Sequence, residues 1–416
     1  MDREINDTFI NEALDNNVFG RNKKAINIIN HIAKSDKQEW IAINGPWGSG
    51  KSVFVKEIEY LINNKEKYKQ ICREVRIEPE NIQYLDIFYY NSWENDAIKN
   101  PVLSLLFQII NKYDLSIISD AEERKMIFDI LKKLASQISF HGIKIDFENI
   151  SFESYLEECI TAEDIRNNFN LIIDKVLAEK NNRLVIIIDE LDRCRPTFAV
   201  ELLETIKHFY LNDKITFIFA TNINQLSNTV KKVYGNDYDG ELYLFRFFSK
   251  VYDFTRYSKD KFIATYLDFD LRENHIAQLT AEVCINYFNF SIRQITQFVN
   301  SIKYHNEFIT FRGIMFDAKF HFMSRNVLFI IGLATKFVSR EQFKKFIKGE
   351  FEIERFVNSN KRYYGWIADV CIHETDDKER NIEYLKTLYL NMFSHEDLSK
   401  YDEKEEAMRI MNELDE

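Results

Sequence analysis

The chain has 416 residues and a formal net charge of −11, and it holds only 11 Gly and 4 Pro. Hydrophobic residues make up 45% of it and charged residues 29%, which is typical of a globular protein rather than a disordered one. So few Gly and Pro exclude a collagen repeat, a Pro-rich linker and a turn-rich all-β fold, and the negative charge argues against a protein that coats nucleic acid.

Nothing in the sequence indicates export or membrane insertion. The N-terminal stretch lacks the basic-then-apolar pattern of a signal peptide, and the most apolar run, residues 327–338, contains Lys336 and is too short to span a bilayer. The cysteines are widely scattered and form no metal-binding pair, so they indicate reduced thiols in a core; they are Cys72, Cys159, Cys194, Cys284 and Cys371. We therefore expect a cytoplasmic protein without a membrane span.

Five short apolar runs predict buried strands, and helical patterns such as 51–62 and 198–210 separate them. The runs are residues 40–44, 82–90, 184–189, 215–221 and 250–254. Strands that alternate with helices predict an α/β fold with a parallel sheet flanked by helices. The stretch from about 115 to 180 interrupts the alternation, and we interpret it as an insertion at the edge or on a face of the sheet.

The segment after the first run carries the strongest motif, because residues 45–52 fit the pattern GxxxxGK[ST] in full. It follows a strand and opens a helix, which is the setting of a phosphate-binding loop. Lys51 is expected to reach the β and γ phosphates of ATP, and Ser52 to offer its hydroxyl to Mg²⁺. The predicted nucleotide-binding residues of this loop are Gly45, Pro46, Trp47, Gly48, Ser49, Gly50, Lys51 and Ser52.

The third run ends in acidic residues, Asp189 and Glu190, at the edge of the sheet where ligands bind in such folds. Asp189 is expected to hold Mg²⁺ and Glu190 to activate the attacking water as a general base. Asp192 and Arg193 follow, and the sequence leaves open whether they are catalytic or form a local ion pair. Asn222, at the end of the fourth run, is a candidate to orient water or touch the γ phosphate, although polar strand ends are common in any sheet.

After residue 257 the pattern is helical to the end of the chain. We divide the chain into a core at 1–257, a helical part at 258–308 and a mostly helical C-terminal region at 309–416. The C-terminal region ends in an acidic tail, where residues 396–416 hold nine acidic and three basic residues.

These motifs together resemble the KAP family of P-loop NTPases, which is related to the STAND and AAA+ groups. The loop Gly-Pro-Trp-Gly-Ser-Gly-Lys-Ser and the acidic segment Asp-Glu-Leu-Asp-Arg-Cys at 189–194 carry the most specific likeness, and weaker matches lie at 18–21, 91–94, 235–248 and 291–300. The resemblance spans residues 10–305. It implies an ATP-binding, Mg²⁺-dependent hydrolase whose part at 258–308 is a helical lid.

The resemblance implies further roles and also shows departures. By resemblance, Arg293 is a sensor arginine on the lid and Arg246 an arginine finger, acting within the chain or from a neighbouring subunit. Both are also typical surface or ion-pairing arginines. Phe19, Gly20 and Arg21 are implied to line the adenine pocket, or they form a turn at a helix end. Asn222, Ile292 and Arg246 stand where members usually have Asp, Pro and Lys, and the family's paired membrane helices are replaced by the insertion at 115–180.

Three functions stay open at this point. The first is an ATP hydrolase whose turnover drives work or self-assembly, with a part in antiviral defence implied by the resemblance. The second is a nucleotide-gated switch with slow hydrolysis that binds a protein partner through the C-terminal region. The third is a nucleic-acid-handling ATPase, which the net charge does not support and for which the pairs Lys344-Lys345 and Lys361-Arg362 are thin support.

Overall fold

The computed structural model describes residues 5–17, 19–97, 101–112, 183–209, 212–254, 262–263, 275–309, 318–369, 378–393 and 401–415. The chain divides into two compact units, Met1–Tyr257 and Ser258–Glu416. The predicted insertion at 115–180 lies outside the described residues, as do Cys159 and Cys371. Each unit has its own core and is considered separately.

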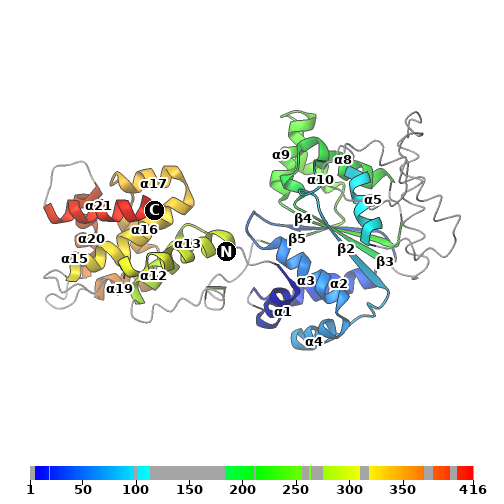
Figure 1. Cartoon of the computed structure of the whole chain (residues 1–416), viewed down its shortest axis with the longest axis horizontal. Coiled ribbons are helices and arrows are strands. Elements are labelled where there is room, and N and C mark those ends of the chain that lie inside the picture. The colour runs from blue at the N-terminus through cyan, green and yellow to red at the C-terminus, as the bar shows by residue number, and fades with distance from the viewer. Residues whose placement is uncertain are drawn as a thin grey trace, which may run out of the picture. The chain divides into compact units, whose positions relative to one another are not determined.

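The first unit is built on a five-stranded parallel sheet, which confirms the predicted fold class (Figure 1). The strand order is β2-β3-β4-β1-β5. The strands are β1 (Glu39–Asn44), β2 (Leu85–Asn91), β3 (Arg183–Asp189), β4 (Ile215–Thr221) and β5 (Lys250–Asp253). Since β4 lies between β1 and β3, the phosphate-binding loop, Asn222 and the acidic segment follow the carboxyl ends of three adjacent strands.

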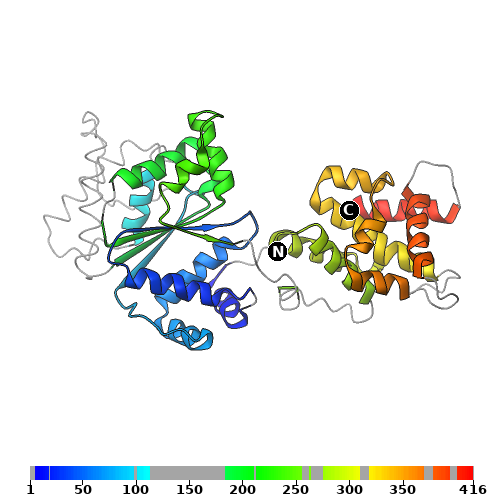
Figure 2. The ribbon, with the colours of Figure 1, turned by 180° about the vertical axis from the view of Figure 1, so that it is seen from behind.

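Helices cover both faces of this sheet, as the views from front and back show (Figure 1, Figure 2). One face carries α1 (Asp7–Asn16), α2 (Asn22–Lys34), α3 (Lys51–Asn63) and α4 (Lys65–Val75). The other carries α5 (Pro101–Lys112), α8 (Pro196–Phe209), α9 (Ile223–Tyr234) and α10 (Gly240–Phe245). Because strand side chains alternate between faces, Trp40 and Ala42 of β1 join the α8 side, and Ile41 and Ile43 join the α3 side.

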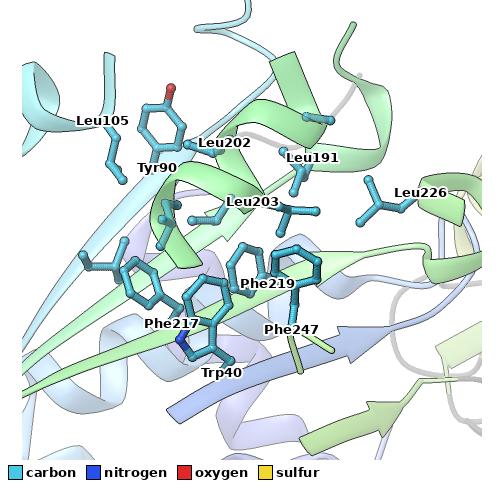
Figure 3. Close-up of a cluster of buried hydrophobic side chains, with 14 of the residues drawn as sticks. Trp40, Tyr90, Leu105, Leu191, Leu202, Leu203, Phe217, Phe219, Leu226 and Phe247 are labelled. Atoms are coloured by element: carbon cyan, nitrogen blue, oxygen red, sulfur yellow. The ribbon is translucent and has the colours of Figure 1, made fainter. Parts of the chain in front are cut away.

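An aromatic cluster on the α8 side fixes β1 against β4 (Figure 3). The Trp40 ring of β1 stacks on Phe219 of β4, with ring centroids 5.4 Å apart, and lies 5.0 Å from the ring of Phe217. Leu191, from the 3-10 turn η2 (Leu191–Arg193) that follows β3, is fully buried in the same core. The cluster therefore anchors the strand before the phosphate-binding loop and the turn after the acidic strand in one packed body.

In the second unit, every regular element that the structure describes is a helix. These are α12 (His275–Tyr287), α13 (Ile292–Tyr304), α14 (Asn306–Ile309), α15 (Ala318–Met323), the π-helical η3 (Ser324–Phe329), α16 (Ile330–Val338), α17 (Arg340–Ile347), α18 (Ile353–Asn358), α19 (Lys361–Asp369), α20 (Lys378–Phe393) and α21 (Tyr401–Asp415). Helices α12 and α13, expected to form the lid, pack against α16. The expected lid and the expected C-terminal region therefore share one core in this unit.

The most apolar run of the sequence, residues 327–338, lies in η3 and α16. Most of its side chains are buried in the second unit, including Leu328 and Ile331, which are fully inaccessible to solvent. Among the helices of the described residues, none is both long enough and apolar enough to cross a membrane. Cys72, Cys194 and Cys284 are free, buried thiols, as the sequence predicts for these three.

Candidate active site

The loop at residues 45–52 joins β1 to α3 in a conformation that requires glycine. Gly48 and Gly50 have φ angles of 74° and 85°, which residues with a side chain rarely adopt. A Cβ atom on Gly45 would lie 2.9 Å from the Cβ atom of Phe254, so this glycine is required by a close approach. Helix α3 begins directly at Lys51, and its first backbone N–H groups are those that attract an anion at a helix N-terminus.

The Lys51 ammonium group is folded back onto the loop that precedes it. It donates hydrogen bonds to the carbonyl oxygens of Gly45 and Pro46, at 2.7 and 3.2 Å. Its side chain is buried, and this burial lowers the pKa of Lys51, while the carboxylates of Asp192 and Asp189 act in the opposite direction. A buried ammonium group whose hydrogen bonds go to backbone carbonyls can exchange them for stronger, charge-assisted ones to phosphate oxygens.

Asp189 ends β3 on the α3 side of the sheet and is 1% exposed. Its Oδ1 atom accepts a hydrogen bond from the backbone N–H of Glu190 at 2.8 Å and its Oδ2 atom one from the Tyr89 hydroxyl at 2.9 Å, and the Ser52 hydroxyl lies near enough to favour the ionised carboxylate. Burial raises the pKa of Asp189 above its usual range, although these hydrogen bonds oppose the shift. The two residues predicted to hold the metal, Ser52 and Asp189, thus lie near each other.

Ser52 and Asp189 fit Mg²⁺ rather than a metal held by protein ligands alone. Both offer hard oxygen atoms, the ligand type that Mg²⁺ prefers. Within the described residues, no group of three or more His, Cys, Asp or Glu side chains gathers to form a metal cage. One hydroxyl and one carboxylate suit a cation that takes its other ligands from phosphate and water.

Glu190 follows the strand with a strained backbone. Its φ angle is 60°, which is uncommon for a residue other than glycine and recurs at functional sites. The Glu190 carboxylate forms an ion pair with Arg193 at 2.9 Å, and the Arg193 guanidinium lies 5.6 Å from the centre of the exposed Trp93 ring. Arg193 therefore pairs with Glu190 and holds its side chain, whereas an ion pair between Arg193 and Asp192, one of the two interpretations of the sequence, is not the one seen here.

Asp192 links the acidic turn to the phosphate-binding loop. The Trp47 indole N–H donates to Asp192 Oδ2 at 2.5 Å, and the Thr221 hydroxyl donates to Asp192 Oδ1 at 3.2 Å. The Trp47 side chain is half exposed, whereas Asp192 is buried. The loop after β1, the turn after β3 and the end of β4 are thus joined through one carboxylate.

The residues predicted to line an adenine pocket lie behind the phosphate-binding loop. Arg21 is buried and donates from its NH2 group to the carbonyl of Ser49 at 2.8 Å. Its guanidinium lies over the rings of Phe19 and Phe254, 4.3 and 3.7 Å from their centres. Arg21 therefore supports the loop from the side of α2, and contact of Phe19, Gly20 and Arg21 with adenine stays a prediction.

The remaining predicted residues differ in their surroundings. Asn222 caps α9, its side chain accepting from the Gln225 backbone N–H at 3.4 Å. Arg246 is exposed at the end of α10 in the first unit. Arg293 is exposed in the first turn of α13 in the second unit. Catalytic roles for these three residues stay predictions.

Sequence reasoning missed two side chains that hold the acidic residues, Tyr89 and Thr221. The Tyr89 hydroxyl donates to Asp189 Oδ2 at 2.9 Å from the neighbouring strand β2, and Thr221 holds Asp192 from β4. Both were recognised as strand residues. The sequence signal available for these two residues was the two-residue periodicity of each strand. Periodicity shows which residues share a face of the sheet, but not which face lies next to the acidic segment.

Comparison with known proteins identifies a family and distant structural neighbours. The model of the KAP family P-loop domain matches residues 21–309. Drosophila ORC bound to GC-rich DNA and Cdc6 aligns with a TM-score of 0.35 and 10% identity, over 93% of this chain and 52% of that chain. The Aeropyrum pernix ORC2 protein in its ADPNP-ADP complexes aligns with a TM-score of 0.31 and 10% identity, over 95% and 93%. The chain thus spans about half the length of the fly chain, and neither likeness is strong enough to add to the argument. No curated protein matches the sequence.

Proposed function

Because the chain belongs to the KAP family of P-loop domains, we propose that it binds ATP together with Mg²⁺ and hydrolyses the γ phosphate. The observation that carries the proposal is that the phosphate-binding loop meets the acidic segment, through the Trp47–Asp192 hydrogen bond and the closeness of Ser52 to Asp189. Such a loop and such a carboxylate act together only when they lie close, and here they follow β1 and β3, the two strands on either side of β4.

In this proposal each side chain has a defined task. The backbone N–H groups of the loop and of the first turn of α3 bind the phosphates, and Lys51 exchanges the carbonyls of Gly45 and Pro46 for phosphate oxygens. Ser52 and Asp189 hold Mg²⁺, which neutralises phosphate charge when bound. Glu190 orients the attacking water and accepts its proton. Arg193 keeps the Glu190 carboxylate in a fixed direction.

Substitution of Lys51 and Glu190 separates binding from hydrolysis. Lys51→Ala removes a charge-assisted contact to phosphate, and we expect ATP affinity to fall about 10- to 100-fold. Glu190→Gln keeps the contacts to phosphate but loses the base, so it should bind ATP normally and turn over about 10²- to 10⁴-fold more slowly. Binding is measured by calorimetry and turnover by phosphate release.

Lys69→Ala and Glu241→Gln are the matched controls, because both side chains lie on the surface of the first unit. They should leave both measurements unchanged. Normal turnover in Glu190→Gln would show that another group is the base, and unchanged ATP affinity in Lys51→Ala would remove the basis of the proposal.

A nucleotide-gated switch with slow hydrolysis is the second candidate. It is favoured by large apolar side chains exposed on α9 and α10, namely Val233, Tyr234, Leu242 and Phe245, which are 39 to 59% exposed. Such side chains are typical of surfaces that bind a protein. Light scattering of the Glu190→Gln variant with and without ATP distinguishes the candidates, since only the switch requires a change in assembly or partner binding before hydrolysis. A role in antiviral defence stays a prediction.

A further inference from the structure

The carboxylate of Asp189 is held at both oxygen atoms, and one of its partners comes from another strand. The Glu190 backbone N–H donates to Oδ1 at 2.8 Å, and the Tyr89 hydroxyl donates to Oδ2 at 2.9 Å. In the parallel register of β2 and β3, Asn91 lies opposite Asp189, so Tyr89 stands two residues earlier and on the same face of the sheet. The two hydrogen bonds together fix the rotation of the carboxylate.

The ring of Tyr89 is itself held by the helix that carries Ser52. The Lys56 ammonium group of α3 lies 3.4 Å from the centre of the Tyr89 ring, and it also pairs with Glu59 at 2.7 Å. Lys56 is four residues after Ser52, so both side chains project from the same side of α3. One helix thus carries Ser52, which lies near Asp189, and supports the Tyr89 ring that orients Asp189.

The Tyr89 hydroxyl is maintained as a donor. Burial raises the pKa of Tyr89 well above its usual range, and the nearby carboxylate of Asp189 raises it further. In this contact the phenol donates and the carboxylate accepts, so the hydrogen bond favours the ionised form of Asp189 against the effect of burial.

We infer that Tyr89 is a positioning residue for the Mg²⁺ site, because its hydrogen bond to Oδ2 fixes the rotation of the Asp189 carboxylate beside Ser52. The inference rests on the proposed function, in which Ser52 and Asp189 hold the cation that accompanies ATP. Outer contacts that orient a metal ligand typically change metal affinity by about 10- to 100-fold. Removal of the Tyr89 hydroxyl should therefore raise the Mg²⁺ concentration needed for Mg²⁺-dependent binding of ATP. Binding of ATP without metal should stay unchanged.

The neighbouring tyrosine provides a matched control for the test. Tyr90 is 1% exposed and its hydroxyl contacts the Ser104 hydroxyl at 2.9 Å, on the opposite face of the sheet and away from Asp189. Tyr89→Phe and Tyr90→Phe remove the same atom from adjacent positions of one strand. The measurement is the fluorescence anisotropy of a labelled ATP analogue, first in EDTA and then during titration with MgCl₂.

In Tyr89→Phe, binding in EDTA should match the wild type, and the Mg²⁺ concentration at half-saturation should rise about tenfold. In Tyr90→Phe both values should stay as in the wild type. The inference is overturned when Tyr89→Phe shows the wild-type Mg²⁺ dependence, or when both variants shift it equally. A wild-type protein that does not bind the analogue overturns the proposed function itself.

A second variant serves if Tyr89→Phe does not fold, as judged by circular dichroism. Lys56→Met removes the cation from the Tyr89 ring and keeps an unbranched side chain of similar length. It should raise the required Mg²⁺ concentration in the same direction while binding in EDTA is retained. An unchanged Mg²⁺ dependence in a folded Lys56→Met protein would count against the inference.

Discussion

Glu57 is a carboxyl group within helix α3 whose burial makes stability depend on pH. Its side chain is 5% exposed, and within the described part of the chain its Oε2 atom has no hydrogen-bond partner. Burial raises the pKa of Glu57 from 4.5 to about 7, and the charge of Arg21 opposes this only in part. The folded protein therefore binds a proton that the unfolded chain has lost between these two pH values.

Replacement of this carboxyl group tests the sign of the effect. Because the folded pKa is the higher one, the contribution of Glu57 to stability falls as pH rises from 4.5 to about 7 and stays lost above that. At about 1.4 kcal/mol for each pH unit, the loss is about 3 kcal/mol. We expect Glu57→Gln to raise the free energy of unfolding above pH 7, and the gain to shrink toward pH 5.

Urea unfolding of wild type and variant between pH 5 and 8 measures this difference. Glu66→Gln is the control, because Glu66 is an exposed side chain of the neighbouring helix α4. A constant difference between wild type and Glu57→Gln across the pH range would contradict the prediction.

Among the elements, helix α21 packs part of the acidic tail into the core of the second unit. The switch hypothesis assigns partner binding to the C-terminal region that ends in this tail, and within that region α21 buries Ala407, Ile410 and Leu414 in the second unit. Its Glu406 is 2% exposed and accepts two hydrogen bonds from Arg325 of the π-helical η3, at 2.6 and 3.1 Å. The Arg325 guanidinium also lies 4.6 Å from the centre of the Phe308 ring. Part of the acidic tail is therefore a docked helix of the core.

Loss of this buried pair should destabilise the second unit strongly. Glu406→Ala leaves the Arg325 charge buried without its carboxylate, and we expect a loss of about 3–5 kcal/mol in the free energy of unfolding. Glu405→Ala is the control, because Glu405 pairs with Arg409 at the surface and such pairs contribute only about 0–1 kcal/mol. Chemical denaturation followed by circular dichroism measures both, and equal losses would exclude a special role for the buried pair.

For the whole molecule, the division into two units predicts two steps of unfolding. Lys51, Ser52, Asp189 and Glu190 all belong to the first unit, and the Arg325–Glu406 pair belongs to the second. Since each unit has its own core, calorimetry of the full chain should resolve two transitions. The nucleotide site and the buried pair then act on different transitions.

A nonhydrolysable ATP analogue with Mg²⁺, at a hundredfold excess over its dissociation constant, should stabilise the first unit by about 2.7 kcal/mol. For a unit of this size, that raises one transition by about 5 to 10 °C. Glu406→Ala should lower the other transition, and Lys51→Ala should reduce the stabilisation by the same analogue concentration to about 0.4–1.4 kcal/mol. A single transition that responds to both changes would contradict the division.

The sequence alone determined the type of fold and the main residues of the candidate site. Five apolar runs predicted the five strands, because local periodicity and composition suffice to indicate a buried strand. The phosphate-binding loop and the acidic strand end were also readable, because the residues of each motif are contiguous in the chain. Their predicted catalytic roles await the experiments above.

Only the tertiary structure decided which side chains meet. It placed β4 between β1 and β3, brought Trp47 of the loop to Asp192, and turned Tyr89 rather than Tyr90 toward Asp189. It also buried Glu406 of the acidic tail against Arg325. The contacts between side chains join residues that lie 81 to 145 positions apart in the sequence. The choice of Tyr89 over Tyr90 depends on which face of the strand each residue occupies. Both depend on strand order, register and packing, which arise from the free energy of the whole fold and leave no local pattern in the sequence.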